Sequence, residues 1–279
     1  MKQIRDQQKD LWNKFSPGWK KWDDLTMEFL EPMGIEIVRL IAPKEKELIL
    51  DVASGTGEPG LTIANMIREG NGKVIATDIS NGMLEIACEN ANKRGINNFE
   101  TIISDVSDLP FEDNTFDAIS CRFGFMFFPG MLQAAKEMVR VLKPGGRIAT
   151  SVWGAPEKNF WITTAMKTLK KNMDLPEVPK DAPGMFRCAE IGLMAEIFKQ
   201  AGMKNISEKE VSSKLNTGTA EAYWNFLNDV VAPVVSAMSQ ANDSLKNKIK
   251  DEVFDLVNQK YPEGNVAIDS SAYVVYGEK

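Results

Sequence analysis

The chain has 279 residues, which is enough for one α/β domain with added segments or for two small domains. An apolar fraction of 43% and a charged fraction of 26% are typical of a soluble globular protein and exclude a disordered or fibrous chain. Its 33 basic and 39 acidic residues give a formal charge of −6, which argues against a nucleic acid partner.

The sequence contains no histidine. This excludes Ser-His-Asp and Cys-His nucleophile pairs and metal sites with imidazole ligands. The three cysteines, Cys88, Cys121 and Cys188, lack the paired spacing of a zinc site, so we expect no metal. Unpaired thiols are typical of the reducing cytoplasm. The longest apolar run, residues 123–132, is too short to cross a bilayer, so we expect a soluble cytoplasmic protein with no membrane span.

Short apolar runs alternate with helical segments between residues 44 and 153. The expected strands cover residues 48–52, 74–78, 99–103, 116–121 and 147–153, and the expected helices cover 61–67, 81–91 and 131–142. Strands that alternate with helices indicate right-handed crossovers and a parallel sheet with both faces covered. This region therefore predicts an α/β core.

Helical patterns flank this core on both sides. In the N-terminal segment, Trp12, Phe15, Trp19 and Trp22 indicate either a helix packed on the core or a lid over a site. After the core, we expect helices at 160–173, 190–201, 223–238 (with a kink at Pro233) and 245–261, a proline-rich connection at 176–183 and a final strand at 266–276. The segment 154–265 is interpreted as added cover over the core.

The turn after the first strand carries the most specific signal. Gly55-x-Gly57-x-x-Gly60 satisfies the dinucleotide fingerprint, so an NAD(P)- or flavin-dependent oxidoreductase is one interpretation. However, Asp51 at the strand end and Glu58 inside the turn would each repel a diphosphate by about 1–4 kcal/mol. S-adenosylmethionine instead carries a cationic sulfonium and an ammonium group. We expect Asp51 to help hold the ammonium end, directly or through water, and backbone N–H groups of the turn to receive the carboxylate.

Two further acids follow the next strands. Asp78 ends the second strand, where an acid accepts hydrogen bonds from ribose hydroxyls in either cofactor class. Asp105 follows the third strand, where it can accept a hydrogen bond from the exocyclic amine of adenine. Val106 or Ile79 would then pack on the ring face. These positions favour an adenosyl ligand without phosphates.

The run from Leu48 to Gly57 resembles the first motif of class I S-adenosylmethionine-dependent methyltransferases. Asp78, Ser104-Asp105-Val106, Leu109-Pro110-Phe111 with Phe116-Asp117, and Leu142 to Gly146 resemble later motifs of that family, in order. The subtype is similar to the methyltransferases of ubiquinone and menaquinone biosynthesis. One departure is Ala53-Ser54, where many members have Gly-Cys or Gly-Ser.

The resemblance implies a doubly wound, mostly parallel seven-stranded Rossmann-like α/β sheet with helices on both faces and extra helical cover. It divides the chain into an N-terminal helical lid (1–43), an S-adenosylmethionine-binding core (44–153) and a C-terminal part (154–279). The last part is expected to contain substrate-covering helices at about 157–184 and 219–262, and closing strands. The expected cofactor-binding residues are Asp51, Ala53, Ser54, Gly55, Thr56, Gly57, Asp78, Ile79, Met83, Asp105, Val106, Arg122 and Phe123.

The activity implied is that of an enzyme of the EC 2.1.1 type, which moves a methyl group to O, N or C of a small-molecule acceptor and leaves S-adenosylhomocysteine. A cofactor-binding module without activity is a further alternative. Trp19, Trp22, Tyr223 and Trp224 are candidates for a lid or substrate wall. Without histidine, a proton must leave through a carboxylate, tyrosine, lysine or solvent, so we assign no catalytic residue and expect catalysis by positioning. The sequence assigns neither the acceptor nor an oligomeric state.

Overall fold

A computed structural model describes residues 2–176, 179 and 181–279. Residues 177, 178 and 180, within the expected proline-rich connection and the end of the expected 157–184 cover, lie outside the described residues. Seven strands of the described chain form one sheet in the order β3-β2-β1-β4-β5-β7-β6. They are β1 (Leu48–Val52), β2 (Lys73–Asp78), β3 (Phe99–Ile103), β4 (Phe116–Arg122), β5 (Leu142–Trp153), β6 (Lys204–Gly218) and β7 (Val266–Glu278).

The sheet is mixed. Strands β1 to β5 are all parallel, whereas β7 is antiparallel to both of its neighbours, β5 and β6. The predicted doubly wound core is therefore present, and its parallel part carries the five strands expected from the alternating pattern. The carboxyl ends of these five strands meet at one edge of the sheet, where open α/β folds bind ligands.

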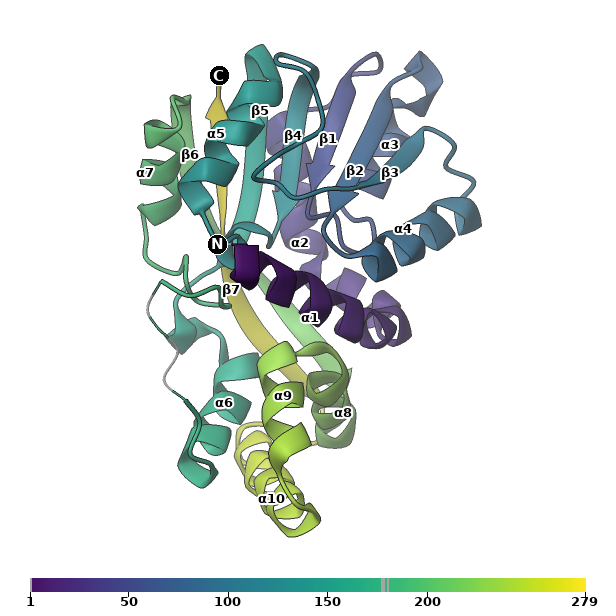
Figure 1. Cartoon of the computed structure of the whole chain (residues 1–279). Coiled ribbons are helices and arrows are strands. Elements are labelled where there is room, and N and C mark those ends of the chain that lie inside the picture. The colour runs from purple at the N-terminus through teal and green to yellow at the C-terminus, as the bar shows by residue number, and fades with distance from the viewer. Residues whose placement is uncertain (1, 177–178, 180) are drawn as a thin grey trace.

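Helices cover both faces of the sheet, with α5 in front and α2 behind in Figure 1. Figure 1 also shows α1 lying across the structure, between the sheet and a group of helices formed by α6, α8, α9 and α10. The long strands β6 and β7 extend from the sheet toward this group. The α-helices are α1 (Lys2–Lys21), α2 (Asp23–Ile41), α3 (Gly60–Ile67), α4 (Asn81–Lys93), α5 (Met131–Val141), α6 (Phe160–Asn172), α7 (Leu193–Gln200), α8 (Ala220–Val230), α9 (Ala232–Gln240) and α10 (Asp243–Lys260).

Three elements differ from the sequence predictions. Strand β6 lies within the segment interpreted as added cover, because an edge strand with mostly exposed polar side chains carries little apolar signal. The expected helix 223–238 is two helices, α8 and α9, since Pro233 stands in the first turn of α9 and starts a new helix. Helix α1 continues through Pro17, which is tolerated where the surrounding packing holds the helix.

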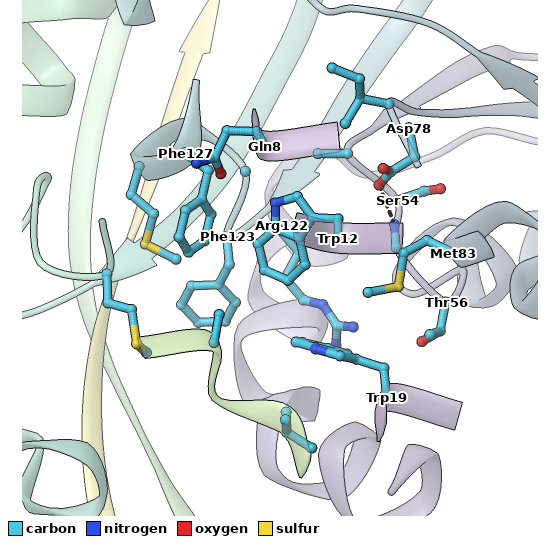
Figure 2. Close-up of a pocket in the computed structure, with 18 of the residues that line it drawn as sticks. Gln8, Trp12, Trp19, Ser54, Thr56, Asp78, Met83, Arg122, Phe123 and Phe127 are labelled. Atoms are coloured by element: carbon cyan, nitrogen blue, oxygen red, sulfur yellow. Dashed lines mark hydrogen bonds between the residues drawn. The ribbon is translucent and has the colours of Figure 1, made fainter. Parts of the chain in front are cut away.

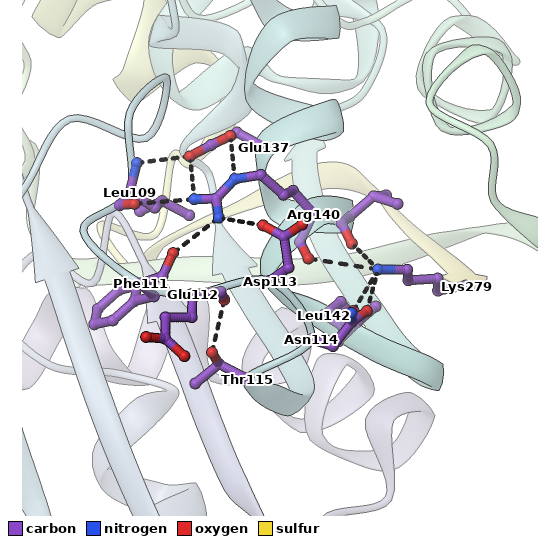
Figure 3. A network of polar contacts seen from close by, with 11 residues as sticks. Leu109, Phe111, Glu112, Asp113, Asn114, Thr115, Glu137, Arg140, Leu142 and Lys279 are labelled. Atoms are coloured by element: carbon purple, nitrogen blue, oxygen red, sulfur yellow. Dashed lines mark hydrogen bonds and ion pairs between the residues drawn. The ribbon is translucent and has the colours of Figure 1, made fainter.

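The loop between β3 and β4 is fixed by a side chain of α5. The guanidinium of Arg140 donates to the carbonyl oxygens of Leu109 (3.0 Å) and Phe111 (2.8 Å) and to the carboxylates of Asp113 and Glu137 (Figure 3). Glu137 also accepts from the backbone N–H of Leu109 at 2.9 Å. These contacts hold the loop that begins directly after the third strand and contains Asp105.

Replacing Arg140 is therefore expected to destabilise the fold. In Arg140→Met, two backbone carbonyls and Glu137 lose their charged donor, so the free energy of unfolding should fall by about 1–3 kcal/mol. Arg68→Met is the control, because among the described residues the Arg68 side chain pairs only with the exposed Glu69, and its loss should cost less than about 0.5 kcal/mol. Urea denaturation measures both values, and equal losses in the two variants would contradict this account of the loop.

Candidate functional site

The glycine-rich turn between β1 and α3 takes a path that larger residues would block. A Cβ on Gly57, whose φ is +112°, would lie 2.7 Å from Cδ1 of Leu61, and one on Gly60 would lie 2.7 Å from Oδ2 of Asp51. Gly55 also has a positive φ, and a Cβ there would meet nothing within 4 Å. The turn is thus closely packed at Gly57 and Gly60, whereas the space next to Gly55 is free.

Asp78 links this turn to the start of α4. One of its carboxylate oxygens accepts from the backbone N–H of Gly55 (3.0 Å), and the other accepts from that of Ser80 (2.9 Å). Burial raises the pKa of Asp78, while these backbone hydrogen bonds oppose the rise. Each carboxylate oxygen can accept a second hydrogen bond, so Asp78 can still receive donors from a ligand.

Asp105 lies in the next loop along the same edge. Its Oδ1 accepts from the backbone N–H of Ser107 at 2.9 Å, and its Oδ2 lies 3.3 Å from Nη1 of Arg5, a residue of α1. The ion pair with Arg5 joins the N-terminal helix to the core beside the expected adenine position. Asp105 was predicted to bind the cofactor from its place after the third strand, whereas no sequence pattern indicated Arg5.

One cavity of about 190 Å³ connects these residues. It is lined by twelve of the expected positions: Trp19, Ala53, Ser54, Gly55, Thr56, Asp78, Ile79, Met83, Asp105, Val106, Arg122 and Phe123. The structure therefore brings together side chains from the ends of β1, β2, β3 and β4, as predicted from the order of the motifs. Figure 2 shows Asp78, Ser54, Thr56 and Met83 on one side of this cavity and the aromatic rings of Phe123 and Phe127 on the other.

Buried polar atoms without a partner gather in the cavity. Among the described residues, the lining side chains of Gln8, Trp19, Thr26, Ser54 and Thr56 each have a buried nitrogen or oxygen with no hydrogen-bond partner. A buried polar atom left unpaired costs free energy, and in native structures such atoms usually have a ligand or water as partner. The polar half of the cavity therefore fits a ligand that carries several hydrogen-bonding groups, such as an adenosyl amino acid.

The opposite half of the cavity is aromatic. Phe123 and Trp153 stack with ring centroids 4.2 Å apart, and Trp161 and Phe29 pack on Trp153 at 5.0 and 5.7 Å. Phe123 has a φ of +59°, a left-handed conformation that bulky residues rarely adopt. This strained turn after β4 places the Phe123 ring against Trp153 at the end of β5, so the strand ends form an aromatic wall.

Helix α1 lines the cavity with one of its faces. Arg5, Gln8, Trp12 and Trp19 are spaced by three, four and seven residues, which brings them to the same side of a helix. Of these four residues, only Trp19 was predicted to belong to the site; the spacing is the sequence signal that identifies the other three. The Trp12 ring packs edge-on against Phe127 at 5.0 Å.

Five expected residues do not line the cavity in the described structure. Asp51 is fully buried beneath the turn; its Oδ1 accepts from the hydroxyl of Ser120 at 2.6 Å, and its Oδ2 has no hydrogen-bond partner among the described residues. Gly57 faces Leu61 on the packed side of the turn.

The other three belong to the expected lid or substrate wall. Trp22 donates its indole N–H to Asp229 at 2.8 Å, and the buried Tyr223 donates its hydroxyl to the carbonyl oxygen of Trp161 at 2.6 Å. Trp224 lines a separate shallow pocket between α8, α9 and α10. None of these three side chains forms a wall of the cavity in the described structure.

The fold and the site together define a Rossmann-like domain with a partly polar, partly aromatic cavity at the carboxyl edge of its sheet. The model of the ubiE/COQ5 methyltransferase family matches residues 33–177, and the chain belongs to this family. It is an S-adenosylmethionine-dependent methyltransferase, and nothing in the comparisons supports the oxidoreductase alternative.

Related proteins are consistent with this assignment. The chain is 29% identical to the demethylmenaquinone methyltransferase of Bacillus subtilis over 67% of this chain and 79% of the relative. It is 31% identical to that of Bacillus licheniformis over 67% of this chain and 78% of the relative. The solved structure of the YcgJ protein from Bacillus subtilis shares the fold, with a TM-score of 0.59 and 18% identity over 89% of this chain and 98% of that one. No helix in the described part of the chain is long and apolar enough to span a membrane.

The buried carboxyl group of Asp51 should make stability depend on pH. Burial raises the pKa of Asp51 to about 7, whereas its value in the unfolded chain is about 3.9. Between these values the folded state binds a proton that the unfolded state has released, so stability falls as the pH rises from about 4 to 7. In Asp51→Asn this dependence is absent. The unfolding free energy of the wild type, measured relative to that of Asp51→Asn, should therefore fall by on the order of 1–4 kcal/mol as the pH rises across that range.

Urea denaturation at several pH values measures this difference. Asp108→Asn, which removes an exposed acid three residues from Asp105, corrects for the general effect of one lost negative charge. A wild-type to Asp51→Asn difference that stays constant with pH would show that Asp51 is ionised in the folded protein throughout.

Proposed function

We propose that the polar half of the cavity binds S-adenosylmethionine and that the aromatic half binds a planar acceptor of the quinol type. The observation that carries the proposal is the continuity of the two halves. Asp78 and Asp105 line the same cavity as the aromatic wall of Phe123, Trp153 and Trp161. Two ligands, one bound in each half, would meet between the turn after β1 and the turn after β4.

For the adenosyl part, each contact has a candidate in the cavity. The carboxylate of Asp78 is suited to accept from ribose hydroxyls, and that of Asp105 to accept from the adenine amine. The side chains of Ile79, Met83 and Val106 supply apolar contacts for the purine ring. These roles are the ones expected from the motifs, and the shared cavity supports them.

For the acceptor, the aromatic wall favours a flat ring. Stacking and edge contacts with Trp153 and Trp161 stabilise planar ligands more than branched aliphatic ones. The relatives in Bacillus are demethylmenaquinone methyltransferases. We therefore infer methylation of a ring carbon in the reduced, electron-rich form of a naphthoquinone-like acceptor.

The chain contributes alignment and exclusion of water. Bound S-adenosylmethionine supplies a methyl group on a cationic sulfur, which an electron-rich ring carbon accepts with loss of its proton. Holding both reactants in one cavity makes the encounter effectively intramolecular, and the aromatic side chains keep water away from the reacting groups. The buried Tyr223, whose pKa is raised by burial and whose hydroxyl is bonded to Trp161, is unsuited to act as a base.

We further propose that α1, the first part of the expected lid of residues 1–43, closes over the cavity while α2 stays packed on the sheet. Asn13 of α1 accepts hydrogen bonds from the hydroxyl of Ser80 (2.7 Å) and the backbone N–H of Gly82 (3.2 Å), at the start of α4. At its other end, Lys21 forms an ion pair with Asp229 of α8 at 2.7 Å. Together with the ion pairs of Arg5 with Asp105 and of Lys20 with Glu89, these are polar contacts that must break for α1 to move during ligand exchange. On this proposal residues 44–153 bind the cofactor, and residues 154–279 cover the acceptor.

The cofactor assignment is tested with Asp78→Asn. Loss of the charged acceptor should weaken binding of S-adenosylhomocysteine at least about tenfold in isothermal titration calorimetry. Asp108→Asn should bind as the wild type does, because Asp108 is exposed and outside the cavity. Unchanged affinity in a folded Asp78→Asn protein would contradict the placement of the ribose.

The acceptor assignment is tested with S-adenosylmethionine that carries a deuterated methyl group. We expect the label on a ring carbon of a reduced demethylated naphthoquinone, detected by mass spectrometry, and no transfer to the oxidised form, whose ring is electron-poor. Transfer to amines or carboxylates, with none to reduced quinones, would refute the quinol assignment and leave methyl transfer intact.

A further inference from the structure

Arg122 brings a charged group with few partners into the cavity. It is the last residue of β4, and Figure 2 shows its side chain pointing toward the indole of Trp19. Among the described residues, the one hydrogen bond of its guanidinium is a weak contact of 3.6 Å to the sulfur of Met27. Burial lowers the pKa of Arg122. A guanidinium has five N–H donors, so most of them remain for a ligand.

Neutral donors line the same cavity. The indole N–H of Trp19 and the hydroxyls of Thr26 and Thr56 are buried and have no hydrogen-bond partner within the described structure. The side chains of Thr26 and Thr56 are 1% and 2% exposed, so solvent does not satisfy them. An indole nitrogen only donates, and the hydroxyls can donate as well. These four residues, Arg122, Trp19, Thr26 and Thr56, are hereafter called the donor cluster.

None of the three carboxylates whose charge acts on Arg122 has a hydrogen bond to it in the described structure, although Asp51 and Asp23 each keep one buried oxygen without a partner. Asp51 is bonded to Ser120, and Glu58 pairs with Arg94. Asp23 accepts through one oxygen from Asn90 at 3.0 Å. Their negative charge favours the charged form of the guanidinium without occupying its N–H groups.

We propose that the donor cluster binds the α-carboxylate of the methionyl part of the methyl donor, with Arg122 as its charged partner. This inference rests on the proposed function of the cavity. A carboxylate is the planar anion that a guanidinium holds through two hydrogen bonds. Thr56 belongs to the same turn as Gly55, which is bonded to Asp78, so the cluster adjoins the expected ribose position. The acceptor wall, in contrast, is built from Trp153, Trp161 and Phe29.

The donor cluster also spans the expected lid and the core. Trp19 belongs to α1 and Thr26 to α2, whereas Thr56 and Arg122 belong to the core. A carboxylate bound between them joins α1 to the sheet through hydrogen bonds to both sides. The carboxylate is thus the part of the donor that holds the lid closed, and an adenosine thioether without it leaves α1 free to open.

The test compares two ligands that differ in this group. S-adenosylhomocysteine carries the carboxylate, and 5′-methylthioadenosine keeps the adenosine and the sulfur but lacks the amino acid part. In calorimetry, Arg122→Met should bind S-adenosylhomocysteine at least about tenfold more weakly than the wild type and 5′-methylthioadenosine equally well. Arg122→Lys, which keeps the charge, should recover part of the loss. Trp19→Phe, which keeps a ring and removes the N–H, should show a smaller selective loss.

The Asp78→Asn protein is the matched control, because it should weaken both ligands alike. Hydrogen–deuterium exchange gives a second measurement: S-adenosylhomocysteine should protect peptides of α1 more than 5′-methylthioadenosine does, and Arg122→Met should remove this difference. Wild-type affinity for S-adenosylhomocysteine in Arg122→Met would overturn this proposal and leave the cofactor site standing. Failure of the wild type to bind either ligand would instead overturn the proposed function, and this inference with it.

Discussion

The site depends on the packing of one turn against one buried carboxyl group. The turn after β1 lies directly on Asp51, so closely that a Cβ on Gly60 would lie 2.7 Å from its Oδ2. Asp51 is in turn bonded to Ser120 of the neighbouring strand β4. This packing sets the path of the backbone from β1 into α3. It thereby points the N–H of Gly55 at Asp78 and the carbonyl of Thr56 at Asn90.

Local patterns were sufficient to predict the core and much of the polar half of the site. The five parallel strands are short apolar runs buried by the helices between them, and such runs are visible in the sequence. Asp78 and Asp105 were found because each follows a strand, and the ends of parallel strands share one edge. For Asp51, the sequence shows the charge and the position at a strand end, but not how deeply the turn buries the side chain.

Features that depend on contacts between distant segments were harder to predict. Strand β6 has mostly exposed side chains, and its pairing with β7 joins residues about fifty to seventy positions apart. The sequence did not indicate that one face of α1 lines a cavity. Its residues Arg5, Gln8 and Trp12 are polar or amphipathic, so they form no periodic apolar pattern. The ring stack of Phe123 and Trp153 joins the ends of two strands. It depends on the left-handed backbone conformation of Phe123, which bulky residues rarely adopt.

The family match of residues 33–177 covers the turns of the polar half and the rings of Phe123, Trp153 and Trp161 in the aromatic half, but it does not cover the whole lining of the cavity. The polar half is formed largely by the turns of the core, which lie inside the family match of residues 33–177. The outer end of the apolar half is formed by Phe226 of α8 and by residues 230–233 where α8 meets α9, outside that match. Methyl transfer therefore belongs to the part shared with the family. On the proposed function, changes at the α8–α9 junction can alter the shape offered to an acceptor while the turns that hold the donor stay the same.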